Sequence, residues 1–83
     1  MSGGEIPDGS DLIPLPMLRP GVDATLVEIR GGSGLGRRLA DMGLVPGVQV
    51  RLVAAGPRGP LVIAAGDTRL ALGRGMAQKI MVR

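Results

Sequence analysis

The chain of 83 residues contains no cysteine and no histidine. Without cysteine it has no disulfide, no thiolate ligand for a metal and no thiol nucleophile. Without histidine it lacks the commonest metal ligand and the side chain most used for proton transfer near neutral pH. The acids Glu28, Asp41 and Asp67 fall on different expected elements and share no ligand spacing. We therefore expect no catalytic residue, no metal site and no cofactor, and we do not expect an enzyme.

Phenylalanine, tyrosine and tryptophan are also absent. Grooves that bind proline-rich peptides are lined with aromatic rings, and proteins that bind single-stranded nucleic acid stack its bases on such rings. Neither kind of surface can form in the usual way from this sequence. The core must consist of Leu, Val, Ile, Ala and Met, because the hydrophobic 45% of the chain contains no other large side chains.

Long apolar runs and dense charge are lacking as well. No run approaches the ~20 residues that cross a bilayer, and the N-terminus has no signal-peptide core, which favours a cytoplasmic protein without membrane insertion. The net charge is +3, and Arg37-Arg38 is the only adjacent basic pair. Because a nucleic-acid footprint is normally denser, we expect no nucleic-acid partner. An RNA-binding small barrel stays as an alternative, and its affinity would fall steeply with salt.

Most of the chain has the pattern of short strands separated by turns. Five segments qualify by their alternating or continuous apolar residues: 24–30, 48–54, 61–65, 68–72 and 79–83. In the first of them, Thr25, Val27 and Ile29 are expected to face the core. Gly66-Asp67 predicts a type II′ hairpin turn. The spacing predicts a mainly β fold, a small five-stranded and partly open barrel, with one helical turn at residues 73–77 before the last strand.

One segment, between the first two expected strands, has the pattern of a helix. Leu35, Leu39 and Met42 recur at i, i+4 and i+7, which places them on one face, expected to be the inner one. Ser33 is the expected N-cap.

The end of this helix is marked by glycine and proline. Gly43 is expected to adopt a left-handed conformation and to close a Schellman motif, in which Leu44 contacts Leu39. Pro46-Gly47 then predicts a type II turn that leads into the second strand.

Residues 1–14 are expected to form a disordered leader, and residues 15–83 the barrel domain. The first eleven residues are polar and rich in glycine, without periodicity. Residues 12–20 are apolar but contain three prolines, which excludes a helix or a central strand. The expected structure is an extended segment over the core, anchored by Leu15 and Leu18. A proline-rich ligand for another protein's groove is the alternative.

Arg37 and Arg38 open the expected helix, where positive charge is unfavourable against the helix dipole. One explanation is an i, i+4 pair of Arg37 with Asp41, which would add only about 0.2–0.5 kcal/mol. The other is recognition of an acidic surface on a partner protein. Both explanations stay open.

Residues 37–48 (RRLADMGLVPGV) resemble the FeoA family. The pattern is a basic start of a helix, Leu-x-Asp-Met-Gly-Leu, x-Pro-Gly and then a strand. The similarity continues upstream at Leu15, Leu18, Pro20-Gly21 and Gly31-Gly32, and downstream at residues 69–72 and 76–82. It covers residues 15–83.

The resemblance implies an SH3-like barrel that assists bacterial ferrous-iron uptake by docking on the permease FeoB, which carries a cytosolic GTPase domain. The expected contacts on this chain are Arg37, Arg38, Asp41, Leu44, Val45 and Pro46. The family is also grouped with transition-metal binding, because similar domains end the DtxR-type repressors. The alternative is therefore a free-standing regulatory or dimerisation module related to those repressor domains, for which weak self-association would be expected.

Overall fold

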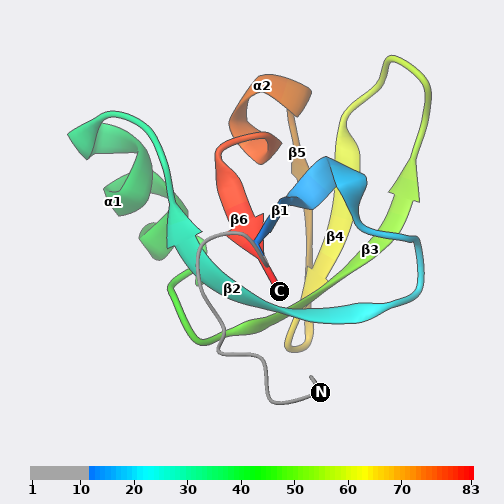
Figure 1. Ribbon diagram of the computed structural model, residues 1–83, viewed down its shortest axis with the longest axis horizontal. Helices are drawn as coiled ribbons and strands as arrows, with labels where there is room; N and C mark the ends of the chain where they lie inside the picture. The colour runs from blue at the N-terminus through cyan, green and yellow to red at the C-terminus, as the bar shows by residue number, and fades with distance from the viewer. Residues whose placement is uncertain (1–11) are drawn as a thin grey trace, which may run out of the picture.

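The computed structural model describes residues 12–83, apart from the side chain of Ser33. Its elements in chain order are β1 (Ile13–Pro14), the 3-10 helix η2 (Leu15–Met17), β2 (Asp23–Ile29), α1 (Ser33–Asp41), β3 (Gln49–Ala55), β4 (Leu61–Ala65), β5 (Thr68–Leu72), α2 (Arg74–Ala77) and β6 (Ile80–Val82) (Figure 1). The predicted helical turn at residues 73–77 is present as α2.

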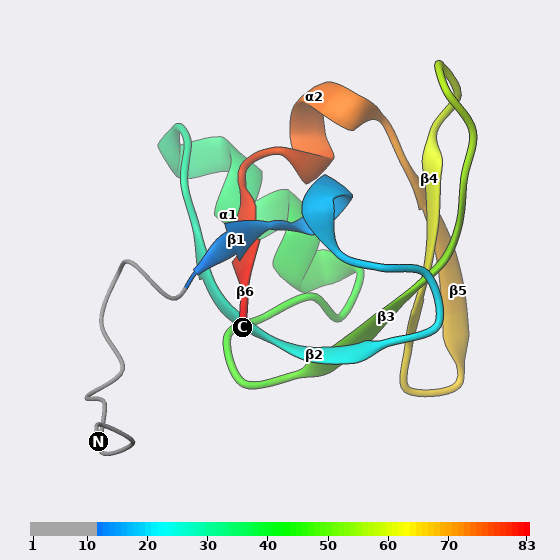
Figure 2. The ribbon, with the colours of Figure 1, turned by 45° about the vertical axis from the view of Figure 1, so that its right-hand side comes forward.

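The described strands form one antiparallel sheet in the order β1-β6-β2-β3-β4-β5. The sheet curls, so that β1 and β6 lie on one side and β4 and β5 on the other, with β2 and β3 joining them (Figures 1 and 2). The curl confirms the expected partly open barrel of mainly β structure.

The described residues contain six strands rather than the expected five. The additional strand is β1, whose two residues pair with Val82 and Met81 of β6. It lies two residues before the expected start of the domain, and a pair this short shows no periodicity in the sequence. Residues 1–11 of the predicted leader lie outside the described residues.

The proline-rich segment covers the core as expected. Leu15 is fully buried and Leu18 nearly so, which confirms both anchors. The segment is not wholly extended, because Leu15–Met17 form a single 3-10 turn. A proline fits at the first positions of such a turn, where its missing N–H would have no partner within the helix.

Strand β2 links the two sides of the barrel. Its first half pairs with β3, and its second half pairs with β6 across an irregularity between Leu26 and Glu28. The extra residue of a bulge reverses which side chains face inward. Leu26 is therefore buried and Val27 only half-buried, so the expected inner face of this strand is wrong before the bulge and correct after it, where Ile29 packs against the core.

The core of the described residues consists of aliphatic side chains together with Met81. No buried polar or charged residue occurs among the described residues. The largest fully buried side chains come from every strand except β1, and from η2, α1 and the turn after α1: Leu15, Leu26, Leu39, Leu44, Leu52, Leu61, Ile63, Leu72, Ile80, Val50 and Val82.

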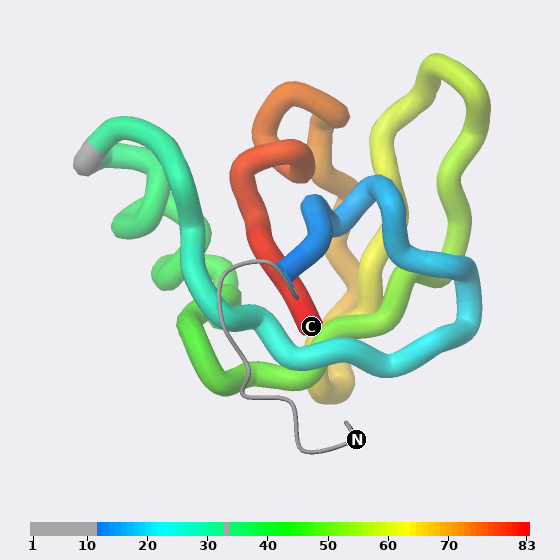
Figure 3. The backbone as a smooth tube through the Cα atoms, in the orientation of Figure 1, coloured from blue at the N-terminus to red at the C-terminus, as the bar shows by residue number. Residues whose placement is uncertain are grey.

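Helix α1 lies at one side of the curled sheet. Figure 3 shows the chain leaving β2, turning back through α1 and returning to β3. Leu39 of α1 is fully buried, and Leu35 packs against the core from a partly buried position. The N-cap is Gly32, not Ser33 as expected, because the helix begins one residue earlier than the sequence indicated.

The hairpin between β4 and β5 has the expected two-residue turn. Gly66 has a φ of +61°, and Ala65 and Thr68 on either side of the turn are paired. A type II′ turn requires a positive φ at its first central residue only, which glycine adopts without strain.

No helix in the described part of the chain has the length and apolar character needed to cross a bilayer.

Candidate partner-binding surface

Helix α1 ends in the Schellman motif that the sequence predicts. Gly43 has a φ of +88°. Its N–H donates to the carbonyl oxygen of Ala40 at 2.9 Å, and the N–H of Leu44 donates to the carbonyl oxygen of Leu39 at 2.8 Å. These are the two hydrogen bonds that define the motif, and they satisfy carbonyl groups left free at a helix end. The Leu39 and Leu44 side chains are both fully buried.

The turn after the helix is also as predicted. Gly47 has a φ of +99°, and the N–H of Val48 donates to the carbonyl oxygen of Val45 at 3.1 Å, as in a type II turn with Pro46 and Gly47 at its centre. The N–H of Gly47 donates in turn to the carbonyl oxygen of Leu26 at 2.7 Å. This last bond attaches the turn to β2, so the position of the turn relative to the barrel is fixed by backbone contacts.

Five of the six contact residues expected from the sequence are exposed. Arg37, Arg38 and Asp41 are exposed on α1, and Val45 and Pro46 are exposed in the turn. The sixth, Leu44, is fully buried. Leu44 therefore cannot contact a partner, and its role is to hold the turn against the core.

Met42 is more exposed than expected. The helical spacing places it on the inner face, yet 37% of it is exposed. Met42 is the C-cap residue, where the chain leaves the helix. The positive φ of Gly43 brings Leu44 back beside Leu39, so Leu44 occupies the core position that helical periodicity assigns to Met42. Met42 consequently joins Val45, which is 43% exposed, as an apolar side chain on the surface.

The pair of Arg37 with Asp41, one of the two explanations offered for the basic helix start, is not present. The ion pairs among the described residues are Arg30 with Glu28 at 2.6 Å and Arg51 with Asp23 at 2.8 Å. The charges of Arg37 and Arg38 at the start of α1 are thus left without a carboxylate partner in the part of the chain that the structure describes.

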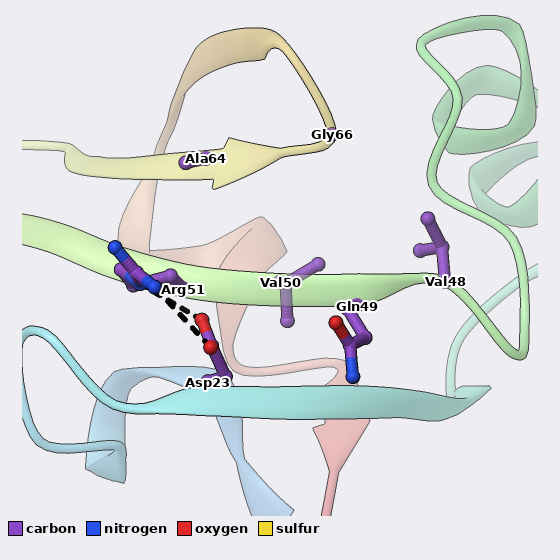
Figure 4. Close-up of a pocket in the computed structure, with 7 residues that line it drawn as sticks. All are labelled: Asp23, Val48, Gln49, Val50, Arg51, Ala64 and Gly66. Atoms are coloured by element: carbon purple, nitrogen blue, oxygen red, sulfur yellow. Dashed lines mark hydrogen bonds and ion pairs between the residues drawn. The ribbon is translucent and has the colours of Figure 1, made fainter.

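A second surface feature is an open pocket of about 370 Å³ over the middle of the sheet, shown in Figure 4. It is lined by Asp23, Val48, Gln49, Val50, Arg51, Ala64 and Gly66. Arg51 donates two hydrogen bonds to Asp23, at 2.8 and 3.2 Å, across the pair of strands. The sequence did not indicate this pair, because its partners are 28 positions apart and meet only through the register of β2 and β3.

The ion pair changes the titration of both groups. The hydrogen bonds from Arg51 hold the pKa of Asp23 below its ordinary value of 3.8. The same hydrogen bonds raise the pKa of Arg51 above its ordinary value. Both side chains are about half exposed, so water and salt screen the pair. Because the opposite charges of Asp23 and Arg51 cancel, the pocket has little net charge of its own.

The acidic residues do not converge on a metal-ligand set. In residues 12–83, no group of three or more acidic side chains lies close enough to hold a metal ion. Carboxylates would be the only strong protein ligands available, since histidine and cysteine are absent from the chain.

Solved structures share this architecture. A crystal structure of the iron uptake regulatory protein FeoA is 36% identical, with a TM-score of 0.79, and the match covers 87% of this chain and 95% of that one. The FeoA of Stenotrophomonas maltophilia, solved with zinc and described as a procaryotic SH3 domain protein, is 32% identical, with a TM-score of 0.71 over 83% of this chain and 87% of its own. The barrel is therefore SH3-like.

The same fold occurs in larger regulators. A manganese-dependent transcriptional repressor superposes with a TM-score of 0.81 over 98% of this chain and 45% of the repressor, at 24% identity. At this identity the likeness concerns the fold alone. The alternative of a repressor-related module stays a prediction.

Sequence comparison identifies the family. The model of the FeoA domain matches residues 13–83. A protein of Methanocaldococcus jannaschii that carries the provisional name Fe(2+) transport protein A is 32% identical over 71 residues, which cover 86% of this chain and 85% of the relative. With the structural matches and the confirmed helix-stop motif, these similarities show that the chain belongs to the FeoA family.

Proposed function

We propose that the chain is a non-catalytic accessory protein of ferrous-iron uptake, which docks in the cytoplasm on the GTPase part of a FeoB-type permease. Its membership of the FeoA family supports a role in ferrous-iron transport. The ferrous ion is the cargo of the permease, and we assign no ligand for it to this chain, because its acidic side chains do not cluster within the described residues.

The docking surface consists of α1 and the turn after it, and is called the α1 surface below. It comprises Arg37, Arg38, Asp41, Met42, Val45 and Pro46. The observation that carries the proposal is the exposure of Met42 and Val45 beside charged side chains that have no partner in the described chain. Methionine and arginine are both enriched in protein–protein interfaces, where apolar side chains form the centre and polar ones the rim.

The backbone of this surface is held in place before any partner arrives. The buried side chain of Leu44 and the hydrogen bond from Gly47 to Leu26 fix the turn that presents Val45. A surface that does not need to be ordered on binding loses less conformational entropy. Arg37 and Arg38 would contact acidic side chains of the partner and contribute mainly to the rate of association.

The test is calorimetric titration of the chain with the purified cytosolic part of FeoB from the same organism. A double variant with Arg37→Glu and Arg38→Glu should bind about tenfold more weakly or worse, since two attractive contacts become repulsive. The matched control is Arg58→Glu, which reverses an exposed charge in the loop between β3 and β4. Equal affinities for the wild type and the double variant, with the fold of both verified by circular dichroism, would contradict the proposal.

The apolar part of the surface needs its own variant. Val45→Asp places a charge at the centre of the interface and should abolish detectable binding, because it buries an unpaired carboxylate. Val45→Ala, which only shortens the side chain, should retain most of the affinity. If Val45→Asp bound as tightly as Val45→Ala, the turn would lie outside the interface.

A further inference from the structure

Strand β5 (Thr68–Leu72) is an open edge of the sheet. It is the last strand in the sheet order and pairs with β4 along its whole length. Outside the sheet ladders, no backbone hydrogen bond of residues 12–83 involves residues 68–72. Figure 2 shows β5 at the outer side of the molecule with β4 next to it. Within the described chain, one side of β5 therefore has no strand partner.

The hairpin geometry identifies which backbone groups point to this open side. Residues that flank a two-residue turn exchange both of their hydrogen bonds, and such pairs alternate with non-hydrogen-bonded ones. Ala65↔Thr68 flanks the turn, so Ile63↔Leu70 and Leu61↔Leu72 are of the same type. The N–H and C=O groups of Arg69 and Ala71 must then point away from β4.

The two edges of the sheet differ in how they are protected. Natural proteins block exposed edges with short strands, proline, bulges or charge. The opposite edge, β1, is two residues long and contains Pro14. Strand β5 is five residues long, contains no proline, pairs with β4 without a register shift and carries a single charged side chain, Arg69. Its exposed edge thus has the regular geometry that an added strand requires.

The side chains along β5 indicate what an added strand would carry. Arg69 is exposed and takes part in no ion pair of the described residues. The neighbouring Arg51, across Ala64 in the register, is already neutralised by Asp23. On the opposite face of β5, Leu70 is only half-buried and packs against the core.

The charge of the whole domain agrees with this local pattern. Residues 12–83 contain all ten basic side chains and four of the seven acidic ones, a net charge of +6. Asp67 in the adjoining turn is the acidic residue nearest to Arg69 along the chain. An incoming strand with acidic side chains is therefore attracted, whereas a second copy of this chain would place two Arg69 side chains on one face of a shared sheet.

We propose that the open edge of β5 is a second docking surface, which binds an extended segment of another protein as an added strand with alternating acidic and apolar side chains. The acidic side chains lie on the face of Arg69, and the apolar ones lie on the face of Leu70. Backbone hydrogen bonds with Arg69 and Ala71 provide the attachment, as in other cases of strand addition. The surface is independent of the proposed α1 surface.

The test uses a capped peptide of sequence Val-Glu-Val-Glu-Val as the probe and amide NMR of the full chain as the readout. Titration should shift the amide signals of Arg69 and Ala71 and slow their hydrogen exchange, because those N–H groups gain acceptors. The Val-Lys-Val-Lys-Val peptide, which offers the same backbone with the opposite charge, should bind about tenfold more weakly. Shifts confined to α1 or to the pocket near Arg51, or equal binding of both peptides, would overturn the proposal.

Three variants separate backbone attachment from general charge attraction. Ala71→Pro removes an outward N–H at an edge position, where proline is tolerated, and should weaken binding of the acidic peptide about tenfold. Ala71→Val keeps the N–H and should bind as the wild type does. Arg69→Glu should bind the lysine peptide more tightly than the glutamate peptide. This variant tests the proposal independently of Ala71→Pro, whose proline could disturb the hairpin. Sedimentation showing a wild-type dimer that Ala71→Pro abolishes would assign the edge to a second copy and contradict the proposal.

The β5 proposal does not depend on binding to a FeoB-type partner. Binding of the acidic peptide to β5 can fail while the α1 surface still binds the permease, and the reverse also holds. The Arg37→Glu, Arg38→Glu variant should retain its β5 shifts with the acidic peptide, which distinguishes the two surfaces within one titration.

Discussion

The N–H of Leu44 donates to the carbonyl oxygen of Leu39 at 2.8 Å, and the side chains of the same two residues are both fully buried. One pair of leucines thus joins helix α1 to the barrel through the backbone and through the core. Gly43 lies between these two leucines, and its φ of +88° turns the chain back towards the core. Because this reversal places Leu44 in the core, the neighbouring Met42 and Val45 are exposed.

Gly43→Ala should destabilise the protein. A Cβ at position 43 meets no heavy atom within 4 Å, so the cost comes from the positive φ alone and should be about 1–2 kcal/mol. The free energy of unfolding, measured by urea denaturation, checks this value. Gly36→Ala is the matched control, because Gly36 lies inside α1 in open space, where alanine should instead stabilise by about 0.5–1 kcal/mol. A stabilising Gly43→Ala would contradict the helix-stop geometry.

Leu44→Ala should be among the more damaging substitutions outside the strands. Leu44 is fully buried, and truncating a buried leucine costs about 2–5 kcal/mol. Val45→Ala, one residue away and 43% exposed, should change stability by less than about 0.5 kcal/mol. Chemical denaturation of both variants tests the contrast, and similar losses for the two would argue against the buried position of Leu44.

The Asp23–Arg51 pair should make stability depend weakly on pH in the acid range. Because the folded pKa of Asp23 lies below its ordinary value of 3.8, the pair stabilises the fold above that pH, and its contribution is lost as the pH falls through the folded pKa. In Arg51→Gln, the pKa of Asp23 should rise towards 3.8, as followed by NMR of the carboxyl carbon. Arg58→Gln, far from Asp23 in the sequence, serves as control. An unchanged Asp23 pKa in Arg51→Gln would show that the pair does not form in solution.

Arg74 should hold the loop between β3 and β4. Its guanidinium donates a hydrogen bond to the carbonyl oxygen of Gly56, which connects α2 with that loop. In Arg74→Gln, the NMR order parameters of Arg58 and Gly59 should fall, while the free energy of unfolding drops by only about 0.5–1.5 kcal/mol. Arg58→Gln leaves this bond intact and should not loosen Gly59. Unaltered order parameters in Arg74→Gln would mean that the loop is ordered by other contacts.

Much of the fold follows from short stretches of sequence. The stop of α1, the type II turn at Pro46-Gly47 and the hairpin at Gly66 are all as predicted. Strands β4 and β5 have the predicted bounds, Leu61–Ala65 and Thr68–Leu72. These features depend on the conformational preferences of glycine and proline and on alternation within one strand, so neighbouring residues suffice to encode them.

Features that join distant residues were missed or placed wrongly. The inner face of β2 differs from the expectation because its bulge exists only in the pairing with β6. Strand β1 forms only through its pairing with β6 at the other end of the chain. In the candidate site, the exposure of Arg37, Arg38 and Asp41 was predicted, but the burial of Leu44 and the exposure of Met42 were not. A helical wheel assigns one direction to each position and does not include the chain reversal at Gly43.

Local preferences along the chain were therefore enough to locate α1 and strands β2 to β6 to within about a residue, but not β1 or η2. The likeness to the FeoA family rested instead on the motif at residues 37–48. The surfaces available for binding depend on how the sheet curls into the partly open barrel. Register placed Asp23 opposite Arg51 and left Arg69 and Ala71 on an open edge, and packing exchanged Leu44 for Met42 in the core. The physical reason is that turns depend on the torsion angles of a few neighbouring residues, whereas exposure depends on which distant strands and side chains occupy the space around them.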